Sequence, residues 1–431
     1  MKYWIETWGC QMNQLDSARL SGNLAGAGME PAAALEEASL FLLNTCSVRE
    51  KAEAKVFARL GELKAWKHRR PGRRIALCGC IAQQYGEALL KRAPLLDFVF
   101  GPGEVDRIAR HIALGVAVAT HLPDAVDYDP AVVDRSDEVI SMVTIMEGCS
   151  QGCSFCIVPR VRGRARSRPA GSIEREVRLL LDDGRDDILL LGQVVNAYRD
   201  PVSGLGLTGL LERLAGLPGV RNLAFVTSHP ALFDPRLPAV MRDHPVLSRY
   251  FHMPIQSGSD RILRAMRRGH SREQYLEAAG RLGDTVPGLA LSSDFIVGYP
   301  GETEADFEET LDLIRRVRFA SLYAFAYSPR PGTSAARIAD DVPAVEKNRR
   351  LNELLRMHDA IQREENGRLA GAVMDAHVVA PGREPGAWVA RTRCNRVVHF
   401  AAADPAAVRP GAWVRLKITE GLPHSLRADP V

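Results

Sequence analysis

The sequence predicts an α/β protein in three parts: an N-terminal domain with a parallel sheet, a central partial (β/α)6 barrel and a small C-terminal antiparallel β-barrel. Three observations lead to this fold class. The chain has 431 residues, too many for one ordinary core. Short apolar runs alternate with helix-like segments in two successive series. After residue 368 the chain changes to short β-rich segments separated by Pro and Gly.

The first series gives an N-terminal domain over residues 1–116. Its predicted strands are KYWIET, SLFLLNT, RRIALCG and DFVFG, and helix-like stretches such as SARLSGNLAGAG and EKAEAKVFARLGELKAW follow them. This alternation favours a parallel sheet covered by helices. Residues 116–136 do not continue this alternation of strands and helices and are predicted to be a linker.

The second series gives a central domain over residues 135–368. Its predicted strands are ISMVTIME, DILLLGQ, NLAFVTS, YFHMPIQ, LALSSDFIVG and SLYAFAYS, with helices such as SIEREVRLLLDD and EADFEETLDLIRRV between them. Six β/α units in a row predict a barrel or a partly open one, with its chemistry at the carboxyl ends of the strands. A charged helix near 344–369 ends this domain.

The last part, residues 369–431, is predicted to be a separate small barrel. Its β-rich segments are AVMDAHVVA, AWVARTR, NRVVHFAA and AWVRLKITE. Segments of this length, separated by turn residues, are typical of a small antiparallel β-barrel.

Composition limits the class of protein. The chain is 46% hydrophobic and 25% charged, as globular proteins are. Its start, MKYWIETWGCQMN, lacks the apolar run of a signal peptide, and no stretch approaches the roughly 18 apolar residues of a membrane span. We therefore expect a cytoplasmic protein without a membrane partner. Its eight cysteines are then expected to bind metals or do redox work rather than form disulfides.

Three cysteines lie in one short loop, EGCSQGCSFC, at Cys149, Cys153 and Cys156. Structural zinc needs four closed ligands, whereas this loop offers three, with no second CxxC and no nearby histidine. An iron–sulfur cubane fits better, because three thiolates hold three irons and leave one corner open for a substrate or cofactor. Zinc is the alternative.

Three further cysteines of the first domain, Cys10, Cys46 and Cys80, each fall where a predicted strand ends and a helix begins. Because the carboxyl ends of parallel strands meet at one edge of a sheet, we expect these thiols to lie close together. The alternative is three unrelated buried cysteines. Cys78 competes with Cys80 as a ligand, and Cys394 is predicted to be a packed thiol.

A run of arginines, PRVRGRARSR, follows the cysteine loop directly. In an extended chain, alternate side chains would line one side. Guanidinium groups bind phosphate through paired hydrogen bonds, so these arginines are predicted to contact RNA, with a solvated basic loop as the alternative. The five residues are Arg160, Arg162, Arg164, Arg166 and Arg168. A predicted helix over 259–268 adds Arg261, Arg264, Arg267 and Arg268.

The C-x3-C-x2-C loop resembles the signature of the radical S-adenosylmethionine (SAM) superfamily, and the whole chain resembles a methylthiotransferase. The stretches that carry this resemblance are NTCSVREKAE, IMEGCSQGCSFCIVP, LLGQ, TSHP, PIQSGSDRILRAMRRGH, DFIVGYPGETEADF and AYSPRPGT. Within the family, NTCSVREKAE is most similar to the branch that modifies isopentenylated adenosine in tRNA. The other branches, which act on threonylcarbamoyladenosine in tRNA or on an aspartate of a ribosomal protein, are the alternatives.

The resemblance implies a methylthiotransferase domain, a radical SAM partial barrel and a TRAM domain, in that order. It also implies two 4Fe–4S clusters, each held by three cysteines. Cys149, Cys153 and Cys156 would hold the radical cluster, whose open iron binds SAM. The auxiliary cluster would be held by Cys10, Cys46 and Cys80, because the motif GCIAQ places the ligand at Cys80.

The implied reaction is methylthiolation of N6-isopentenyladenosine at position 37 of tRNA, with one SAM as methyl donor and a second as the source of a radical. The partners would be tRNA carrying isopentenyladenosine next to the anticodon and an unidentified reductase, with the chain a monomer. The expected SAM contacts, an aromatic residue between two cluster cysteines and three polar residues at strand ends, are Phe155, Gln193, Gln256 and Asp294.

Two positions depart from the family pattern. Val194 replaces an amide in GQVVN, and Ala18 stands where an acid is usual in LDSARL. His229 and His252 are predicted to be structural. An alternative of a different class is a non-catalytic iron–sulfur protein that binds RNA, which would not cleave SAM and would leave the barrel without a role.

Overall fold

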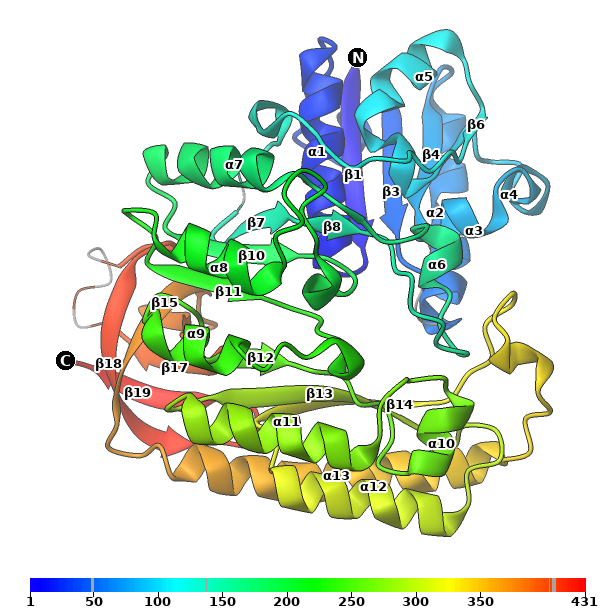
Figure 1. Ribbon diagram of the computed structural model, residues 1–431. Helices are drawn as coiled ribbons and strands as arrows, with labels where there is room; N and C mark the ends of the chain where they lie inside the picture. The colour runs from blue at the N-terminus through cyan, green and yellow to red at the C-terminus, as the bar shows by residue number, and fades with distance from the viewer. Residues whose placement is uncertain (48–49, 137, 403, 405–407) are drawn as a thin grey trace.

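The computed structural model describes residues 1–47, 50–136, 138–402, 404 and 408–431 (Figure 1). Val48 and Arg49 of the NTCSVREKAE motif lie outside the described residues. The predicted fold class is confirmed: an N-terminal parallel-sheet domain, a central partial barrel and a closed C-terminal barrel follow one another along the chain.

The N-terminal sheet is parallel, in the order β2-β1-β3-β4-β5-β6. Its strands are β1 (Lys2–Trp8), β2 (Glu30–Pro31), β3 (Leu40–Thr45), β4 (Arg74–Gly79), β5 (Phe98–Phe100) and β6 (Val118–Ala119). The sequence predicts the four longer strands but misses β2 and β6, because two residues carry no recognisable pattern. The stretch 116–136 is therefore not simply a linker, since β6 extends the sheet to Ala119.

Helices cover both faces of this sheet. On one face lie α2 (Glu50–Arg69), α3 (Cys80–Tyr85) and α4 (Ala88–Arg92), packed over side chains such as Phe41 and Ile75. On the other lie α1 (Gln11–Gly26) and α5 (Ile108–Leu114), packed over Leu40 and Leu42. Burial on both faces explains why β3 is a continuous apolar run without alternation.

The central domain contains the six predicted strands, all parallel, in two three-stranded sheets. A parallel bridge between Leu223 and Leu247 joins the two sheets into one curved layer. The strands are β7 (Ser141–Thr144), β10 (Asp187–Leu191), β11 (Asn222–Phe225), β12 (Tyr250–His252), β13 (Ala290–Val297) and β14 (Ser321–Ala326). A short hairpin of β8 (Met146–Glu147) and β9 (Arg166–Ser167) frames the cysteine loop.

The outer side of the partial barrel is buried under helices that share one apolar core with the strands. These are α7 (Ala170–Asp182), α8 (Leu207–Ala215), α9 (Leu237–Asp243), α11 (Arg272–Thr285), α12 (Glu304–Val317) and α13 (Ala344–Gly367). The inner side of β10 packs instead against α1, through Leu189 and Leu191 on the strand and Met12 and Leu15 on the helix. This contact holds the beginning of α1, next to Cys10, over the inner side of the barrel.

The C-terminal barrel closes in the order β15-β16-β17-β19-β18. Its strands are β15 (Val373–Pro381), β16 (Ala387–Thr392), β17 (Val397–Ala401), β18 (Trp413–Gly421) and β19 (Leu426–Pro430). The sequence predicts the first four, whereas β19 lies in the short tail PHSLRADPV. The expectation of a purely antiparallel barrel is wrong in one detail, because β17 and β19 run parallel.

Several polar contacts attach this barrel to the central domain, and two of them involve adjacent aspartates at the start of β10. His377 Nδ1 lies 2.7 Å from Asp187 Oδ2, with both side chains buried. The Trp413 indole Nε1–H donates to Asp186 Oδ1 at 3.0 Å and stacks on His377. Cys394 is buried at the same junction, as predicted for a packed thiol. None of the described helices has the length and apolar character needed to cross a membrane.

Candidate iron–sulfur site

The structure brings Cys10, Cys46 and Cys80 together at the carboxyl edge of the N-terminal sheet. Cys10 caps α1, Cys46 follows β3 and Cys80 begins α3. Cys46 lies close enough to the other two sulfurs to shift the pKa of each. Cys78 lies elsewhere, in the core between the sheet and α1, where burial raises the pKa of its thiol.

The three grouped thiols have unequal acidities. Hydrogen bonding from Cys46, aided by the positive charge of Arg162, lowers the pKa of Cys10 to about 5 and that of Cys80 to about 7, against the effect of burial. The same hydrogen bonds raise the pKa of Cys46. The site therefore stabilises the thiolates of Cys10 and Cys80, the form of cysteine that binds metal, whereas Cys46 keeps its proton until metal binds.

A pair of buried amides holds this triad in place. Asn13 Oδ1 accepts from the backbone N–H of Cys10 at 3.3 Å, and Asn13 Nδ2 donates to Asn44 Oδ1 at 3.2 Å. Asn44 Nδ2 returns a hydrogen bond to the carbonyl of Asn13 at 2.9 Å. Gly79 has φ +87°, and a Cβ there would lie 2.4 Å from Asn44 Oδ1, so only glycine fits before Cys80. CQMNQ and LLNTC contain these amides, but no local pattern in either stretch indicates that they pair.

The second group, Cys149, Cys153 and Cys156, lies in the loop after β8. The backbone N–H of Cys149 donates to Gly163 O at 3.0 Å, and that of Ser154 donates to Met266 O at 3.0 Å. The sulfurs are close enough for the charge of Cys153 to raise the pKa of Cys149 and of Cys156, and for the charge of Cys149 to raise that of Cys156. Burial is the larger effect and raises the pKa of Cys156 to about 12. These protons must leave when metal binds.

Arg268 is the cation that faces this loop. It is 5% exposed, and its Nη1 donates to Cys153 Sγ at 3.2 Å. The expectation that Arg268 belongs to an RNA-facing helix is therefore wrong. His229 Nε2 lies 4.0 Å from the same sulfur, and burial lowers the pKa of this imidazole to about 3, so it is neutral.

The two cysteine groups border one interface. Cys80 packs against Ile157 and Val161, and Ile157 is the residue after Cys156. Figure 1 shows α6 (Val158–Val161) beside α3 at this boundary. The site is thus assembled from two domains, each supplying three thiols.

The prediction that five arginines line one exposed side of an extended segment is wrong. Residues 158–161 form α6, and 166–167 pair in the hairpin with β8. Arg168 is fully buried and donates to Glu176 Oε2 at 2.6 Å. Arg162 is 3% exposed and donates to Asp16 Oδ2 at 2.5 Å. Neither can reach RNA, because acids distant in sequence hold both inside the protein.

The remaining three arginines differ in exposure. The Arg166 side chain is 10% exposed and lies 3.6 Å from Glu147. Arg160 and Arg164 are exposed. On the neighbouring segment Arg264 and Arg267 are exposed, whereas Arg261 is committed to an ion pair with Asp306. Among the arginines predicted to contact RNA, the exposed ones outside the Asp306 ion pair are therefore Arg160, Arg164, Arg264 and Arg267.

The structure gives the contacts of the four residues expected to bind SAM. Gln193 Oε1 accepts from the backbone N–H of Gly148 at 2.5 Å, which ties the end of β10 to the cysteine loop. Gln256 and Asp294 are backbone neighbours, since Gln256 N–H donates to Asp294 O at 2.9 Å. Phe155 packs beside an apolar cluster that includes Tyr299. Their contacts with SAM remain predictions.

The two departures from the family pattern are accommodated by neighbours. Val194 is buried, and Asn196 two residues later exchanges hydrogen bonds with the backbone of His229 at 2.8 and 2.9 Å. Ala18 packs on the apolar cluster between α1 and β10. A short apolar residue suits that position in this chain. The predicted structural role of His252 fits its contact with Asp294, at 3.5 Å.

Within the described part of the chain, no His, Cys, Asp or Glu side chains form a group arranged to hold a single metal ion. The donor set is two groups of three thiols, with the positive charges of Arg162 and Arg268 beside them. Three thiolates and an adjacent cation suit a buried anionic iron–sulfur cluster with one open corner. The residues therefore fit two such clusters.

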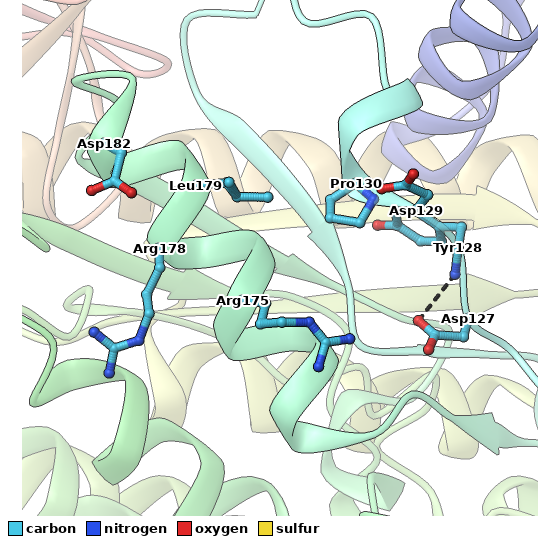
Figure 2. Close-up of a pocket in the computed structure, with 8 residues that line it drawn as sticks. All are labelled: Asp127, Tyr128, Asp129, Pro130, Arg175, Arg178, Leu179 and Asp182. Carbon is cyan, nitrogen blue, oxygen red and sulfur yellow. Dashed lines mark hydrogen bonds between the residues drawn. The ribbon is translucent and has the colours of Figure 1, made fainter.

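A surface hollow of about 720 Å³ lies apart from the cysteines (Figure 2). Residues of α7 and of the segment 127–130, several of them acidic or basic, line this hollow: Asp127, Tyr128, Asp129, Pro130, Arg175, Arg178, Leu179 and Asp182. No thiol and no predicted SAM contact borders it. The hollow is therefore not part of the candidate site.

Comparisons with known proteins agree with this geometry. Two family models match the chain: the Uncharacterized protein family UPF0004 over residues 2–101 and the Radical SAM superfamily over residues 143–314. The tRNA-2-methylthio-N(6)-dimethylallyladenosine synthase of Alkalilimnicola ehrlichii is 41% identical over 99% of this chain and 97% of its own length. The chain belongs to this family of radical SAM enzymes.

Other members are equally similar. The synthase of Moorella thermoacetica is 40% identical over 99% of this chain and 98% of its own length. Among solved structures, the radical SAM methyltransferase TsrM from Kitasatospora setae, with cobalamin and a [4Fe–4S] cluster bound, superposes with a TM-score of 0.57. It is 13% identical and covers 78% of this chain and 77% of its own, so it shares the fold.

Gly148 gives a test of the cysteine loop. Its φ is +75°, and a Cβ there would lie 2.1 Å from the carbonyl oxygen of Arg164. We expect Gly148→Ala to displace the loop and to lower iron uptake during anaerobic reconstitution, measured as iron per chain. Gly152 lies in the same loop with nothing near its added Cβ, so Gly152→Ala should load like the parent protein. Equal loading of both variants would contradict the assigned loop geometry.

Proposed function

We propose that this chain inserts a methylthio group into N6-isopentenyladenosine at position 37 of tRNA, using SAM and two 4Fe–4S clusters. Cys149, Cys153 and Cys156 would hold the radical cluster, and Cys10, Cys46 and Cys80 the auxiliary cluster. The observation that carries the proposal is the packing of Cys80 against Ile157, which joins one thiol group to the other across a domain boundary. The full-length similarity to named synthases supports the substrate class.

The reaction breaks a C–H bond of adenine, which has neither an acidic proton nor a leaving group. When bound, SAM and the clusters would supply the radical, the methyl group and the sulfur that such a bond requires. The side chains then act by holding and shielding the reactants rather than by acid–base catalysis.

The chain's own residues would perform three tasks. Arg268 would stabilise negative charge at Cys153, to which it donates a hydrogen bond. Ser154 anchors the loop through Tyr299 OH, 2.8 Å from its Oγ, and so fixes the direction of the thiols on either side. The packing of α1 against β10 would exclude water from the inner side of the barrel.

The exposed arginines near the cysteine loop would bind the tRNA backbone. Arg160 donates to Gly332 O at 3.0 Å and stays exposed, and Arg164 is exposed two residues after the buried Arg162. Arg267 follows Met266, whose carbonyl accepts from the loop residue Ser154. These cations surround the loop from two segments and would attract phosphate to the mouth of the site.

We further propose that the chain works in the cytoplasm as a monomer and receives electrons from a separate reductase. Two rival substrates within the methylthiotransferase class are tRNA bearing threonylcarbamoyladenosine and an aspartate of a ribosomal protein. A non-catalytic RNA-binding protein is the rival outside that class. This rival is disfavoured because the thiol groups lie beside a six-stranded partial barrel, which a non-catalytic protein would not need.

The proposal is tested with anaerobically reconstituted protein, reductant, SAM and tRNA containing isopentenyladenosine. Mass spectrometry of digested tRNA should detect the methylthio product with the parent protein. Cys46→Ala should cleave SAM but give no methylthio product, because it removes one thiol of the auxiliary group. Cys153→Ala should lose both SAM cleavage and product.

Other results would contradict the proposal. Product formation on a ribosomal protein or on threonylcarbamoyladenosine tRNA, with none on isopentenyladenosine tRNA, would reassign the substrate. Absence of SAM cleavage by the parent would favour the non-catalytic alternative. Cys394→Ala is the matched control, since this thiol is packed at the barrel junction and should not affect product formation.

A second experiment tests the tRNA surface. Replacing Arg160 and Arg164 together with Gln should weaken tRNA binding several-fold and reduce the slope of log K against log salt by about 2, because two phosphate contacts are lost. The control is Arg178→Gln with Arg213→Gln, which removes the same charge from exposed residues paired with Glu174. Equal binding and equal slope in the two double variants would show that Arg160 and Arg164 do not contact tRNA.

A further inference from the structure

Arg162 is a buried cation at the boundary between the first two domains. It belongs to the central domain, where it follows the last residue of α6. Its side chain is 3% exposed, and its Nη2 donates to the buried carboxylate of Asp16 in α1 at 2.5 Å. The radical SAM domain therefore places a positive charge inside the N-terminal domain, next to the thiol group of that domain.

One nitrogen of this guanidinium has no acceptor. Arg162 Nη1 is buried and makes no hydrogen bond to any described residue. A buried donor without a partner destabilises the folded protein, and more so when it is charged. After the larger effect of Cys46, the charge of Arg162 lowers the pKa of both Cys80 and Cys10, so the guanidinium lies close to these sulfurs. Val161, the residue before it, is in contact with Cys80.

We propose that Arg162 Nη1 donates to a sulfur of the auxiliary cluster held by Cys10, Cys46 and Cys80, and so raises the reduction potential of that cluster. The inference rests on the auxiliary cluster proposed above. Reduction adds negative charge to the cluster, and a buried cation with a hydrogen bond to sulfur stabilises the reduced form more than the oxidised form. The low dielectric of the buried site strengthens this effect.

The experiment uses the full-length chain with Cys149, Cys153 and Cys156 replaced by Ala, so that the auxiliary cluster alone is titrated. After anaerobic loading, its midpoint potential is measured by redox titration followed by electron paramagnetic resonance. We expect Arg162→Gln to lower the reduced-to-oxidised ratio at a fixed potential at least tenfold, which corresponds to about 59 mV for a one-electron couple. Arg162→Lys, which keeps the charge, should recover part of this shift.

Asp16→Asn separates the electrostatic role of Arg162 from a packing role. It removes a buried negative charge but keeps the guanidinium, so the potential should move in the opposite direction, to a less negative value. Loss of packing alone would move both variants the same way. Arg178→Gln is the control, because it removes an exposed arginine of α7, where water and salt screen its charge.

Each outcome decides the question. An unchanged potential in Arg162→Gln, or shifts of the same sign in Arg162→Gln and Asp16→Asn, would overturn the role of Arg162 while leaving the cluster in place. If Arg162→Gln does not load, Arg162→Lys and Asp16→Asn still give opposite expectations. A parent protein that binds no cluster through the first thiol group would instead refute the proposed function itself.

Discussion

The site depends on the contact between α3 and the cysteine loop of the central domain. Cys80 packs on Ile157 and Val161, and the buried Asp16–Arg162 ion pair crosses the same boundary. Removing one member of such a pair typically costs about 3–5 kcal/mol, because the other charge stays buried. Without this contact, six thiols would belong to two unrelated domains. With it, two triplets of thiols border one interface, as the proposed reaction with two clusters requires.

Buried charge is the feature that distinguishes this interface from an ordinary apolar one. Arg19, Arg162 and Arg166 meet Asp16 and Glu147 within a few ångströms, from α1 on one side and the β8–β9 hairpin on the other. Such networks cost desolvation free energy and stabilise only in one geometry. They therefore fix the orientation of α1 relative to the cysteine loop more narrowly than apolar packing alone would.

Much of the fold could be predicted from the sequence. The six strands of the central domain are apolar runs that alternate with helical segments, and the three strand-end cysteines follow from the topology of any open parallel sheet. The two-residue strands β2 and β6 and the parallel pair β17–β19 could not be predicted, because their pairing depends on neighbours distant in sequence. Family resemblance, rather than periodicity, gave the substrate and the cluster ligands.

The arginines illustrate what the sequence could not provide. Arg160 and Arg164 are exposed, whereas Arg162 and Arg168 are buried, although all four follow the same alternating pattern. Their acidic partners, Asp16 and Glu176, lie in other elements, and nothing local to PRVRGRARSR identifies them. The contact of Arg268 with Cys153 could not be predicted for the same reason, since a run of charges on a predicted helix normally faces solvent.

The central claim is that two 4Fe–4S clusters lie at one interface, each held by one of the two groups of three thiols. Iron-edge anomalous scattering from crystals of the anaerobically loaded, full-length protein tests it directly. The account predicts two separate iron peaks, one at each thiol group, with the corners that lack cysteine turned toward each other. A single peak, or two clusters whose free corners point to opposite sides of the α3–α6 boundary, would contradict it.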